Sequence, residues 1–462
     1  MALLDFFKKK SSGSLAKDRL NLVLISDRAN CNPEIMEAIK NDIIKVISKY
    51  MEIDCEGLDI QITQTESEGT NGTVPALCAN IPILDMKHSK LRSSMFKQYQ
   101  FRNYRIKLVM LVYILTTIGI LVIGSAEKSY QSQQILGLVL GSAAMLVCSL
   151  TDYNILMQLY WLVFGFILLM LILVLTPLGK EVNGAQRWID LKVITLQPSE
   201  LAKVMLTLFF AKFFSDRYER INDPITIISS IILFGIPAVL ILKEPDLSTT
   251  ITIALVFCSM IFVAGFSYRI IGGLIAIIAP VALVFLGYVM REDQKLLESY
   301  QRNRIMAWLN PSEHADLAYQ QQNSIMAIGS GQLTGKGLNN NAVASVKDAG
   351  YIAEPQTDFI FAVAGEELGF VGTAAIIILL LLIVIEIIMI GRNAKDLAGN
   401  LICCGVASWI GFQSFINICV ATGLMPNTGV PLPFVSYGLT SLVSLYIAIG
   451  IVLNVGLQPR KY

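Results

Sequence analysis

Hydrophobic and polar positions divide the chain into two parts near residue 106. Before that point the apolar residues come in short runs separated by polar and charged ones, and beyond it long apolar segments dominate. A helix needs roughly 20 mainly apolar residues to cross a bilayer. Most of the ten apolar segments reach that length, at residues 108–124, 135–150, 155–176, 197–214, 225–242, 249–266, 270–290, 358–390, 398–421 and 431–457. The pattern predicts a mainly α-helical polytopic membrane domain with ten transmembrane helices over residues 106–460.

The first part of the chain predicts a small α/β domain over residues 1–88. Asn32-Pro33 supplies an N-cap and a first-turn proline for a helix with one apolar face. Asn71-Gly72 lies between two alternating apolar runs, which is typical of a β-hairpin. The expected order is β-α-β-β, with the elements near residues 20–25, 33–50, 60–62 and 77–83.

Residues 1–10 predict a helix that lies on the membrane surface. At 100° per residue, Asp5 points away from the apolar arc of this helix. Lys8, Lys9 and Lys10 can contact anionic lipid headgroups, and each contact stabilises membrane binding by about 1 kcal/mol. A frayed terminus is the alternative. The apolar residues that share one arc of this helix are Leu3, Leu4, Phe6 and Phe7.

Basic residues indicate the orientation of the membrane domain. Between Met86 and Lys107 there are seven basic residues and no acidic one, so the linker 89–105 is expected on the cytoplasmic side. Short loops on the side of the two termini carry 15 Lys and Arg against 5 on the other side. Both termini are therefore predicted to be cytoplasmic. The loop 291–357 has 67 residues, lies outside and is too long for this rule.

Composition narrows the class of protein. The chain has 462 residues, of which 54% are apolar and 15% charged, and this excludes both a water-soluble enzyme and a disordered chain. A net charge of +1 gives no reason to expect a nucleic-acid partner. Five of the eight cysteines lie inside apolar runs, and their spacing predicts no disulfide framework and no metal site.

Acidic residues gather at the predicted outer face of the membrane domain. A carboxylate at mid-membrane costs about 2.5–3.5 kcal/mol on insertion scales, so these groups are expected to line a cavity or to form pairs. Lys203 lies three residues after Glu200 on the same helix face and is its expected partner. Glu200 and Asp358 also fit as plain first-turn helix caps. The group comprises Glu200, Glu244, Asp246, Asp358, Glu366 and Glu367.

Cations are predicted at the same level. Lys336 stands between Gly335 and Gly337 in the long loop, a setting that suits an anionic ligand or, alternatively, a flexible tether. The glycine spacing is not that of a nucleotide-binding loop. Lys336, Arg187 and Lys203, together with the acidic residues, predict an extracytoplasmic cavity for a lipid-linked pyrophosphate. In this cavity the cations balance the negative charge of the leaving group, and a carboxylate accepts a proton.

Three motifs in residues 1–88 resemble the MinE family of cell-division topological specificity factors. They are Met1 to Phe7, Ala16 to Leu20 and Asp42 to Tyr50. The resemblance implies that residues 1–10 target the membrane and that residues 16–28 contact the ATPase MinD, either as a helix or, when hidden, as a strand of a homodimer. The implied MinD-binding residues are Lys17, Arg19, Leu20 and Val23.

Residues 106–460 resemble the SEDS family (shape, elongation, division and sporulation). The resemblance implies a ten-span peptidoglycan glycosyltransferase in the inner membrane of a bacterium, which polymerises lipid II outside the membrane beside a class B penicillin-binding protein. Gly335-Lys336-Gly337 is more similar to RodA than to FtsW. The matching motifs are Asn183 to Trp188, Gln197 to Glu200, Glu244 to Leu247, Ala327 to Gly331, Gly335 to Gly337, Thr357 to Ala362, Gly365 to Gly369 and Pro431 to Gly438.

The SEDS resemblance assigns roles to single residues. Asp358 corresponds to the essential aspartate, expected to act as general base on the 4-hydroxyl of the acceptor lipid II sugar, and Glu200 and Lys203 correspond to the family's Glu and Lys of the fourth span. Arg187 and Lys336 are the candidates for the diphosphate, and a divalent cation (Mg or Mn) is an option. The remaining substrate-binding candidates are Gln197, Asp246 and Glu366.

Four residues depart from the SEDS pattern, and two other functions stay open. A lipid II transporter would place ionisable groups near mid-membrane, where Glu386 is the main candidate. A tethered regulator of division-site placement would make residues 1–88 the main module. The departures are Ser248, Asn323, Gln332 and Leu439; a residue other than glycine at position 332 is expected to stiffen the long loop.

Overall fold

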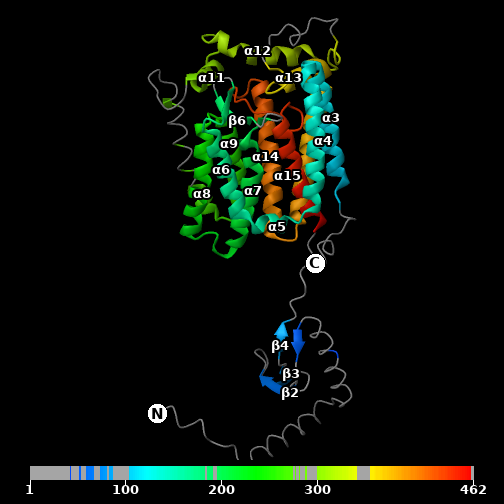
Figure 1. Cartoon of the computed structure of the whole chain (residues 1–462), viewed down its shortest axis with the longest axis vertical. Coiled ribbons are helices and arrows are strands. Elements are labelled where there is room, and N and C mark those ends of the chain that lie inside the picture. Colours follow the sequence, from blue (N-terminus) through cyan, green and yellow to red (C-terminus); the bar gives the residue numbers. More distant parts are fainter. Residues whose placement is uncertain are drawn as a thin grey trace, which may run out of the picture. The chain divides into compact units, whose positions relative to one another are not determined.

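The chain divides into two units, residues 1–97 and residues 98–462, which are described separately. A computed structural model describes residues 42, 51–53, 59–66, 73–80, 83–86, 104–182, 185–190, 195–273, 276, 280, 287–288, 299–340 and 354–458 (Figure 1).

The first unit contains two pairs of antiparallel strands. β2 (Asp59–Glu66) pairs with β3 (Thr73–Asn80), with Ile62 opposite Leu77, so the predicted hairpin is confirmed. Ile83, expected in its second strand, lies in β4 instead. β1 (Met51–Ile53) pairs with β4 (Ile83–Met86). The predicted first strand lies outside the described residues, and of the predicted helix only Asp42 is described, as helical. Also outside the described residues are the predicted membrane and MinD contacts, Leu3, Leu4, Phe6, Phe7, Lys17, Arg19, Leu20 and Val23.

The second unit is a helical bundle. In Figure 1, α11 (Ser299–Leu309) and α12 (Ala315–Ser330) lie across one end, and α5 (Tyr153–Gln158) lies at the other. A three-stranded sheet of β5 (Gly179–Val182), β6 (Ala185–Asp190) and β7 (Thr195–Leu196) lies toward the α11 end. The other helices are α3 (Ile106–Ala126), α4 (Lys128–Leu150), α6 (Tyr160–Val174), α7 (Pro198–Asp216), α8 (Pro224–Lys243), α9 (Leu247–Ala264), α13 (Ile360–Arg392), α14 (Leu397–Ala421) and α15 (Leu439–Leu457), with the short 3-10 helix η2 (Tyr218–Arg220) after α7.

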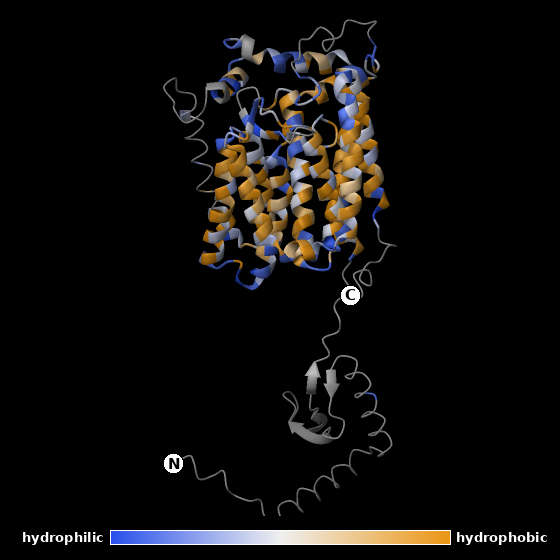
Figure 2. Ribbon diagram, viewed as in Figure 1, coloured by the Kyte–Doolittle hydropathy of each residue, from blue (hydrophilic) through white to orange (hydrophobic). Residues whose placement is uncertain are grey.

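Seven of the described helices are long and apolar enough to cross a membrane: α3, α4, α8, α9, α13, α14 and α15. Figure 2 shows the apolar residues as a band through the middle of the bundle, with polar residues at both ends. α6 is apolar but has 15 residues, because the predicted span 155–176 is divided at Leu159 into α5 and α6. Most of the predicted span 270–290 lies outside the described residues, so the count of ten stays a prediction.

α15 begins at Leu439, later than the predicted residue 431. Pro431 and Pro433 provide no backbone N–H, and the residue before a proline disfavours helical geometry, so this segment is an irregular loop. The loop matters for the site, since it brings Pro431 and Tyr437 to the wall of a cavity.

The residues before α3 and the last residues of α15 lie close together at one end of the helical bundle. A Cβ at Gly456, near the end of α15, would lie 3.7 Å from Arg105, which precedes α3, and 3.4 Å from Ile390 in α13. An even number of crossings requires this arrangement. The side of the membrane that this end occupies stays a prediction.

α7 is enclosed by the bundle, although it carries charged residues. Its side chains Phe209, Phe210, Phe213 and Phe214 are at most 2% exposed and belong to the main hydrophobic core. Burial of this helix places Glu200 and Lys203, which lie in its first two turns, inside the protein, where their charges need partners.

Candidate functional site

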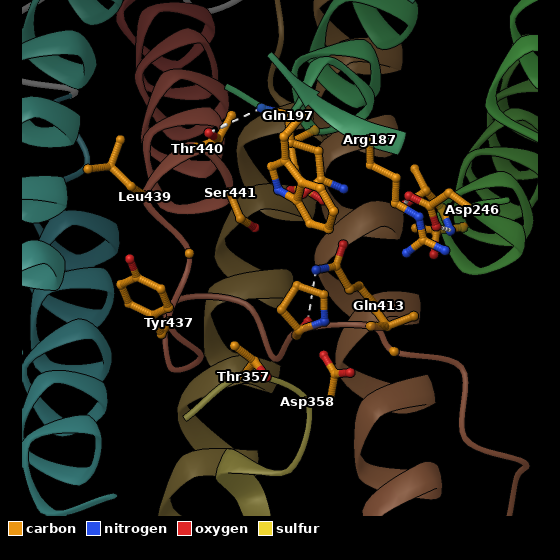
Figure 3. Close-up of a pocket in the computed structure, with 18 of the residues that line it drawn as sticks. Arg187, Gln197, Asp246, Thr357, Asp358, Gln413, Tyr437, Leu439, Thr440 and Ser441 are labelled. Carbon is orange, nitrogen blue, oxygen red and sulfur yellow. Dashed lines mark hydrogen bonds between the residues drawn. The ribbon is translucent and has the colours of Figure 1, made fainter. Parts of the chain in front are cut away.

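A cavity of about 390 Å³ opens among charged and polar side chains contributed by the sheet, α7, α9, α11, α14, α15 and the segment before α13 (Figure 3). It brings together six of the eight residues that the sequence assigned to catalysis or substrate binding: Arg187, Gln197, Glu200, Lys203, Asp246 and Asp358.

Glu200 and Lys203 form the buried ion pair that their spacing predicts. Pro198 occupies the first turn of α7, and the Lys203 ammonium lies 2.7 Å from Glu200 Oε1. The ammonium also donates to Gln413 Oε1 on α14 at 2.9 Å and lies 4.9 Å from the centre of the Trp409 ring. Glu200 Oε2 is buried and accepts no hydrogen bond among the described residues. The pair is a fixed charged wall of the cavity.

Asp246 and Arg187 lie beside the connection between α8 and α9 (Figure 3). Asp246 caps α9, because its carboxylate accepts from the Thr249 backbone N–H at 3.1 Å and from the Thr249 hydroxyl at 2.8 Å. Arg187 Nε donates to the Glu244 carbonyl at 3.1 Å, and the guanidinium also donates to the Pro245 carbonyl. Arg187 is therefore a cation held in place by backbone contacts.

Glu244 lies behind this wall and does not line the cavity. Its side chain is fully buried, and its carboxyl oxygens have no hydrogen-bond partner among the described residues. Burial, and secondarily the charge of Asp246, raise the pKa of Glu244 to about 9, although Arg187 opposes this shift. Glu244 is therefore a neutral acid at neutral pH, which is consistent with its lack of an ion-pair partner.

Asp358 precedes α13 and lies in the cavity wall. The N-cap of α13 is Phe359, and no side chain caps this helix, which argues against the alternative role of Asp358 as a cap. Asn417 Nδ2 donates to the Asp358 backbone carbonyl at 2.8 Å. Burial raises the pKa of the Asp358 carboxyl to about 6, although the nearby Arg304 lowers it. The carboxyl is thus ionised at neutral pH and can accept a proton.

The structure does not bring Lys336 and Glu366 into this cavity, which corrects the expectation that Lys336 lies with Arg187 and Lys203. The Lys336 ammonium lies 2.7 Å from Glu366 Oε1, and neither residue is among those that line the cavity. The Lys336 N–H donates to the Glu366 carbonyl at 2.9 Å, and the Gly337 N–H donates to the Glu367 carbonyl at 2.9 Å. The loop is thus bound along α13.

Glycines explain why this loop packs so closely. A Cβ at Gly331 would overlap the Gly365 carbonyl, and one at Gly335 would overlap the Glu367 carbonyl. α13 has a non-helical residue at Gly369, where φ is 66°, and the Phe370 N–H donates to the Gln332 carbonyl at 2.9 Å. The glycine motifs are therefore sites of backbone-to-backbone packing at a helix kink.

Sequence reasoning missed several residues of the cavity. Gln413 gave a usable signal, because it is a polar residue inside the apolar segment 398–421. Arg304 on α11 had no local signal, since it is one of several basic residues in the long loop. The other lining residues are Trp188, Thr195, Thr249, Thr252, Glu354, Thr357, Gly429, Val430, Pro431, Tyr437, Gly438, Leu439, Thr440 and Ser441.

The donors around the cavity do not form a metal-ligand set. Within the described ranges no three His, Cys, Asp or Glu residues cluster as a metal site would require. The Asp246 carboxylate is occupied by hydroxyl and backbone donors, and Glu200 is paired with Lys203.

Comparison with protein families assigns both parts of the chain. The model of the FtsW, RodA and SpoVE cell cycle proteins matches residues 97–461, and the model of the septum formation topological specificity factor MinE matches residues 1–83. Two relatives are named "Probable peptidoglycan glycosyltransferase FtsW". The one from Nitrosomonas europaea is 36% identical over 64% of this chain and 74% of its own. The one from Geobacter metallireducens is 32% identical over 78% of this chain and 96% of its own.

Solved structures show the same fold. A chain from the work "Structural coordination of polymerization and crosslinking by a peptidoglycan synthase complex" has a TM-score of 0.64 and 29% identity, over 76% of this chain and 97% of its own. The rod shape determining protein RodA of Thermus thermophilus has a TM-score of 0.57 and 26% identity, over 79% and 99%. Relatives carry both names, so the expected preference for RodA stays a prediction. The chain belongs to the FtsW/RodA/SpoVE family of cell cycle proteins and carries a MinE-like segment at its amino-terminal end.

Proposed function

We propose that this protein is a peptidoglycan glycosyltransferase that polymerises lipid II at the outer face of the cytoplasmic membrane. The observation that carries the proposal is that the Asp358 carboxyl lines the same cavity as Arg187 and the Glu200–Lys203 pair. The names of its relatives as glycosyltransferases support the reaction class.

The six predicted residues that line the cavity each have a role in the proposed reaction. Asp358 accepts the proton of the 4-hydroxyl of the acceptor lipid II sugar, and that oxygen attacks the anomeric carbon of the growing strand. The bond to undecaprenyl pyrophosphate breaks with inversion, and Arg187 balances the charge of the leaving diphosphate. Glu200 and Lys203 order the cavity, while Gln197 and Asp246 shape the wall that contacts the substrate.

A transporter has less support. Glu386, the ionisable residue within the membrane span on which that alternative rests, is paired with Lys107 at the start of α3. The charged residues that line the cavity lie toward one end of the bundle and do not form a site near the middle of the membrane.

Replacement of Asp358 by Asn tests the proposal, because it keeps the shape of the side chain and removes the base. Polymerisation of lipid II by the purified full-length protein should fall by about 10²–10⁴. Asp190→Asn is the matched control, since Asp190 is an exposed residue of β6 paired with Lys180 outside the cavity. Unchanged polymerisation by Asp358→Asn, with expression equal to wild type, would refute the role of Asp358 as base.

We further propose that residues 1–88 contact MinD and regulate division-site placement on the cytoplasmic side, and that this segment forms a homodimer. The match of residues 1–83 to MinE supports this. Deletion of residues 1–88 should abolish stimulation of MinD ATPase and leave polymerisation intact. Loss of both activities would contradict two independent modules.

A class B penicillin-binding protein is the proposed partner of residues 106–460, to be tested by co-purification.

A further inference from the structure

One face of α14 carries three buried polar side chains at intervals of four residues, Trp409, Gln413 and Asn417. Residues at this spacing lie above one another on a helix. Their side chains are 0%, 0% and 1% exposed. Buried polar groups are stable only when their hydrogen bonds are made inside the protein, and the partners of this face in other segments line the cavity.

Gln413 uses both ends of its amide. Its Oε1 accepts from the Lys203 ammonium at 2.9 Å and from Trp409 Nε1 at 2.6 Å. Its Nε2 donates to the Pro431 carbonyl at 2.9 Å, the contact drawn as a dashed line in Figure 3. Gln413 therefore connects the charged pair of α7 to the loop that precedes α15.

The amide can take only one orientation. If it were flipped, its NH₂ group would face the N–H donors of Lys203 and Trp409, and its oxygen would face the Pro431 carbonyl. All three contacts would then be repulsive. The position of Lys203 is thus fixed relative to the loop, because the amide has no second low-energy arrangement.

The same loop is fixed relative to Asp358. Asn417 Nδ2 donates to the Asp358 carbonyl at 2.8 Å and to the Val430 carbonyl at 2.7 Å. A Cβ at Gly429 would lie 3.3 Å from Asp358 Oδ2. Adjacent carbonyls of the loop are therefore held by adjacent amides of α14, and the loop lies against the proposed base.

We infer that Gln413 is a positioning residue, which sets the location of the Lys203 ammonium relative to the Asp358 carboxyl and acts on the reaction through Lys203. The inference rests on the function proposed above. Glu200 and Gln413 take two of the three N–H donors of Lys203. Lys203 lines the cavity, and the direction of its third N–H depends on the other two. Without Gln413, Glu200 would be the one hydrogen-bond acceptor left to the ammonium among the described residues, and the direction of the ammonium would be lost.

A double-mutant cycle between Gln413 and Lys203 tests this coupling. The four full-length proteins are wild type, Gln413→Leu, Lys203→Met and the double variant, measured for kcat and KM in lipid II polymerisation. Gln413→Leu should lower kcat by about tenfold or more and change KM less, because a misplaced cation is felt mainly in the transition state. When Lys203 is already Met, the same change should lower kcat by less than about twofold.

If Gln413→Leu lowers kcat by the same factor in the wild type and in Lys203→Met, the inference is overturned. A glutamine with only a structural role would lower kcat whether or not Lys203 is present. If Lys203→Met makes too little polymer for a steady-state assay, the same cycle is closed on the single-turnover rate with the enzyme in excess over lipid II, and the same criterion decides. If Gln413→Leu does not fold, Gln413→Met replaces it, since it has similar length and no hydrogen-bonding amide.

Two controls separate the possible failures. Ser414→Ala removes a neighbouring hydroxyl that donates only to Ile410 of its own helix, and it should leave kcat and the melting temperature unchanged. Asp358→Asn is assayed in parallel. If it retains activity, the proposed function fails; if it is inactive while Gln413 and Lys203 act independently, only the positioning role of Gln413 fails.

Discussion

Arg304 and Asp358 lie against the same face of Gly429. A Cβ added to this glycine would be 3.3 Å from Asp358 Oδ2 and 3.5 Å from Arg304 Nη1. Arg304 belongs to α11 in the long loop, whereas Asp358 precedes α13. The fold of the long loop therefore places the Arg304 guanidinium near the Asp358 carboxyl. This cation lowers the pKa of the carboxyl and so opposes burial, which raises that pKa to about 6.

The pH dependence of polymerisation should report this relationship. The pKa of Asp358 is about 6, so kcat/KM should fall as the pH drops through 6 and the base becomes protonated. Arg304→Ala removes the cation that lowers this pKa, and the acid limb should therefore move to higher pH. The measurement is kcat/KM against pH for both proteins, and a limb that stays in place or moves to lower pH would contradict the assignment.

Gly429 should tolerate no side chain. Its φ is +73°, a left-handed conformation that costs an L-residue about 1–2 kcal/mol, and an added methyl group would crowd both Asp358 and Arg304. Gly429→Ala should lower polymerisation at least about tenfold if the crowding displaces the carboxyl by an ångström. Gly411→Ala is the control, since its methyl would meet only Val384 at 3.9 Å. Equal activities of the two variants would rule out this effect.

The glycine packing at the kink of α13 predicts opposite effects of two similar substitutions. Gly331→Ala should destabilise the protein by about 1–3 kcal/mol, because the methyl overlaps the Gly365 carbonyl. Gly329→Ala should be neutral or stabilising, since no atom lies within 4 Å of its added methyl and alanine favours a helix. Thermal unfolding in detergent compares them, and equal melting temperatures would disprove the packing argument.

The buried pair of α7 should be more sensitive to the loss of one partner than of both. Lys203→Met leaves Glu200, which is 3% exposed, as an uncompensated charge, at a cost of about 3–5 kcal/mol. The double variant Glu200→Gln with Lys203→Met should recover most of this stability while activity stays low. Melting temperatures of the three proteins test this. A double variant less stable than Lys203→Met would show that the pair is not the source of the loss.

The sequence alone predicted the elements that depend on local contacts. The segment 358–390 became α13 (Ile360–Arg392), and the two strands of the hairpin paired with Ile62 opposite Leu77. The ion pair between Glu200 and Lys203 was also predictable, because residues three apart on a helix meet whatever surrounds them. The placement of charged residues at one face of the predicted spans brought Asp358 and Arg187 together, and the structure places both in one cavity. Resemblance to the SEDS family added the expected role of Asp358 as the base.

Only the tertiary structure decided which distant residues meet. Lys336 was expected beside Arg187, but it pairs with Glu366, because glycines let its loop pack directly on the kinked α13. Gln413 and Arg304 joined the site through the packing of α14 and the return of the long loop. Backbone hydrogen bonding within a segment fixes a helix, so its signal lies in neighbouring residues. Contacts between segments depend on the shapes of whole surfaces, to which no single stretch of sequence gives a signal.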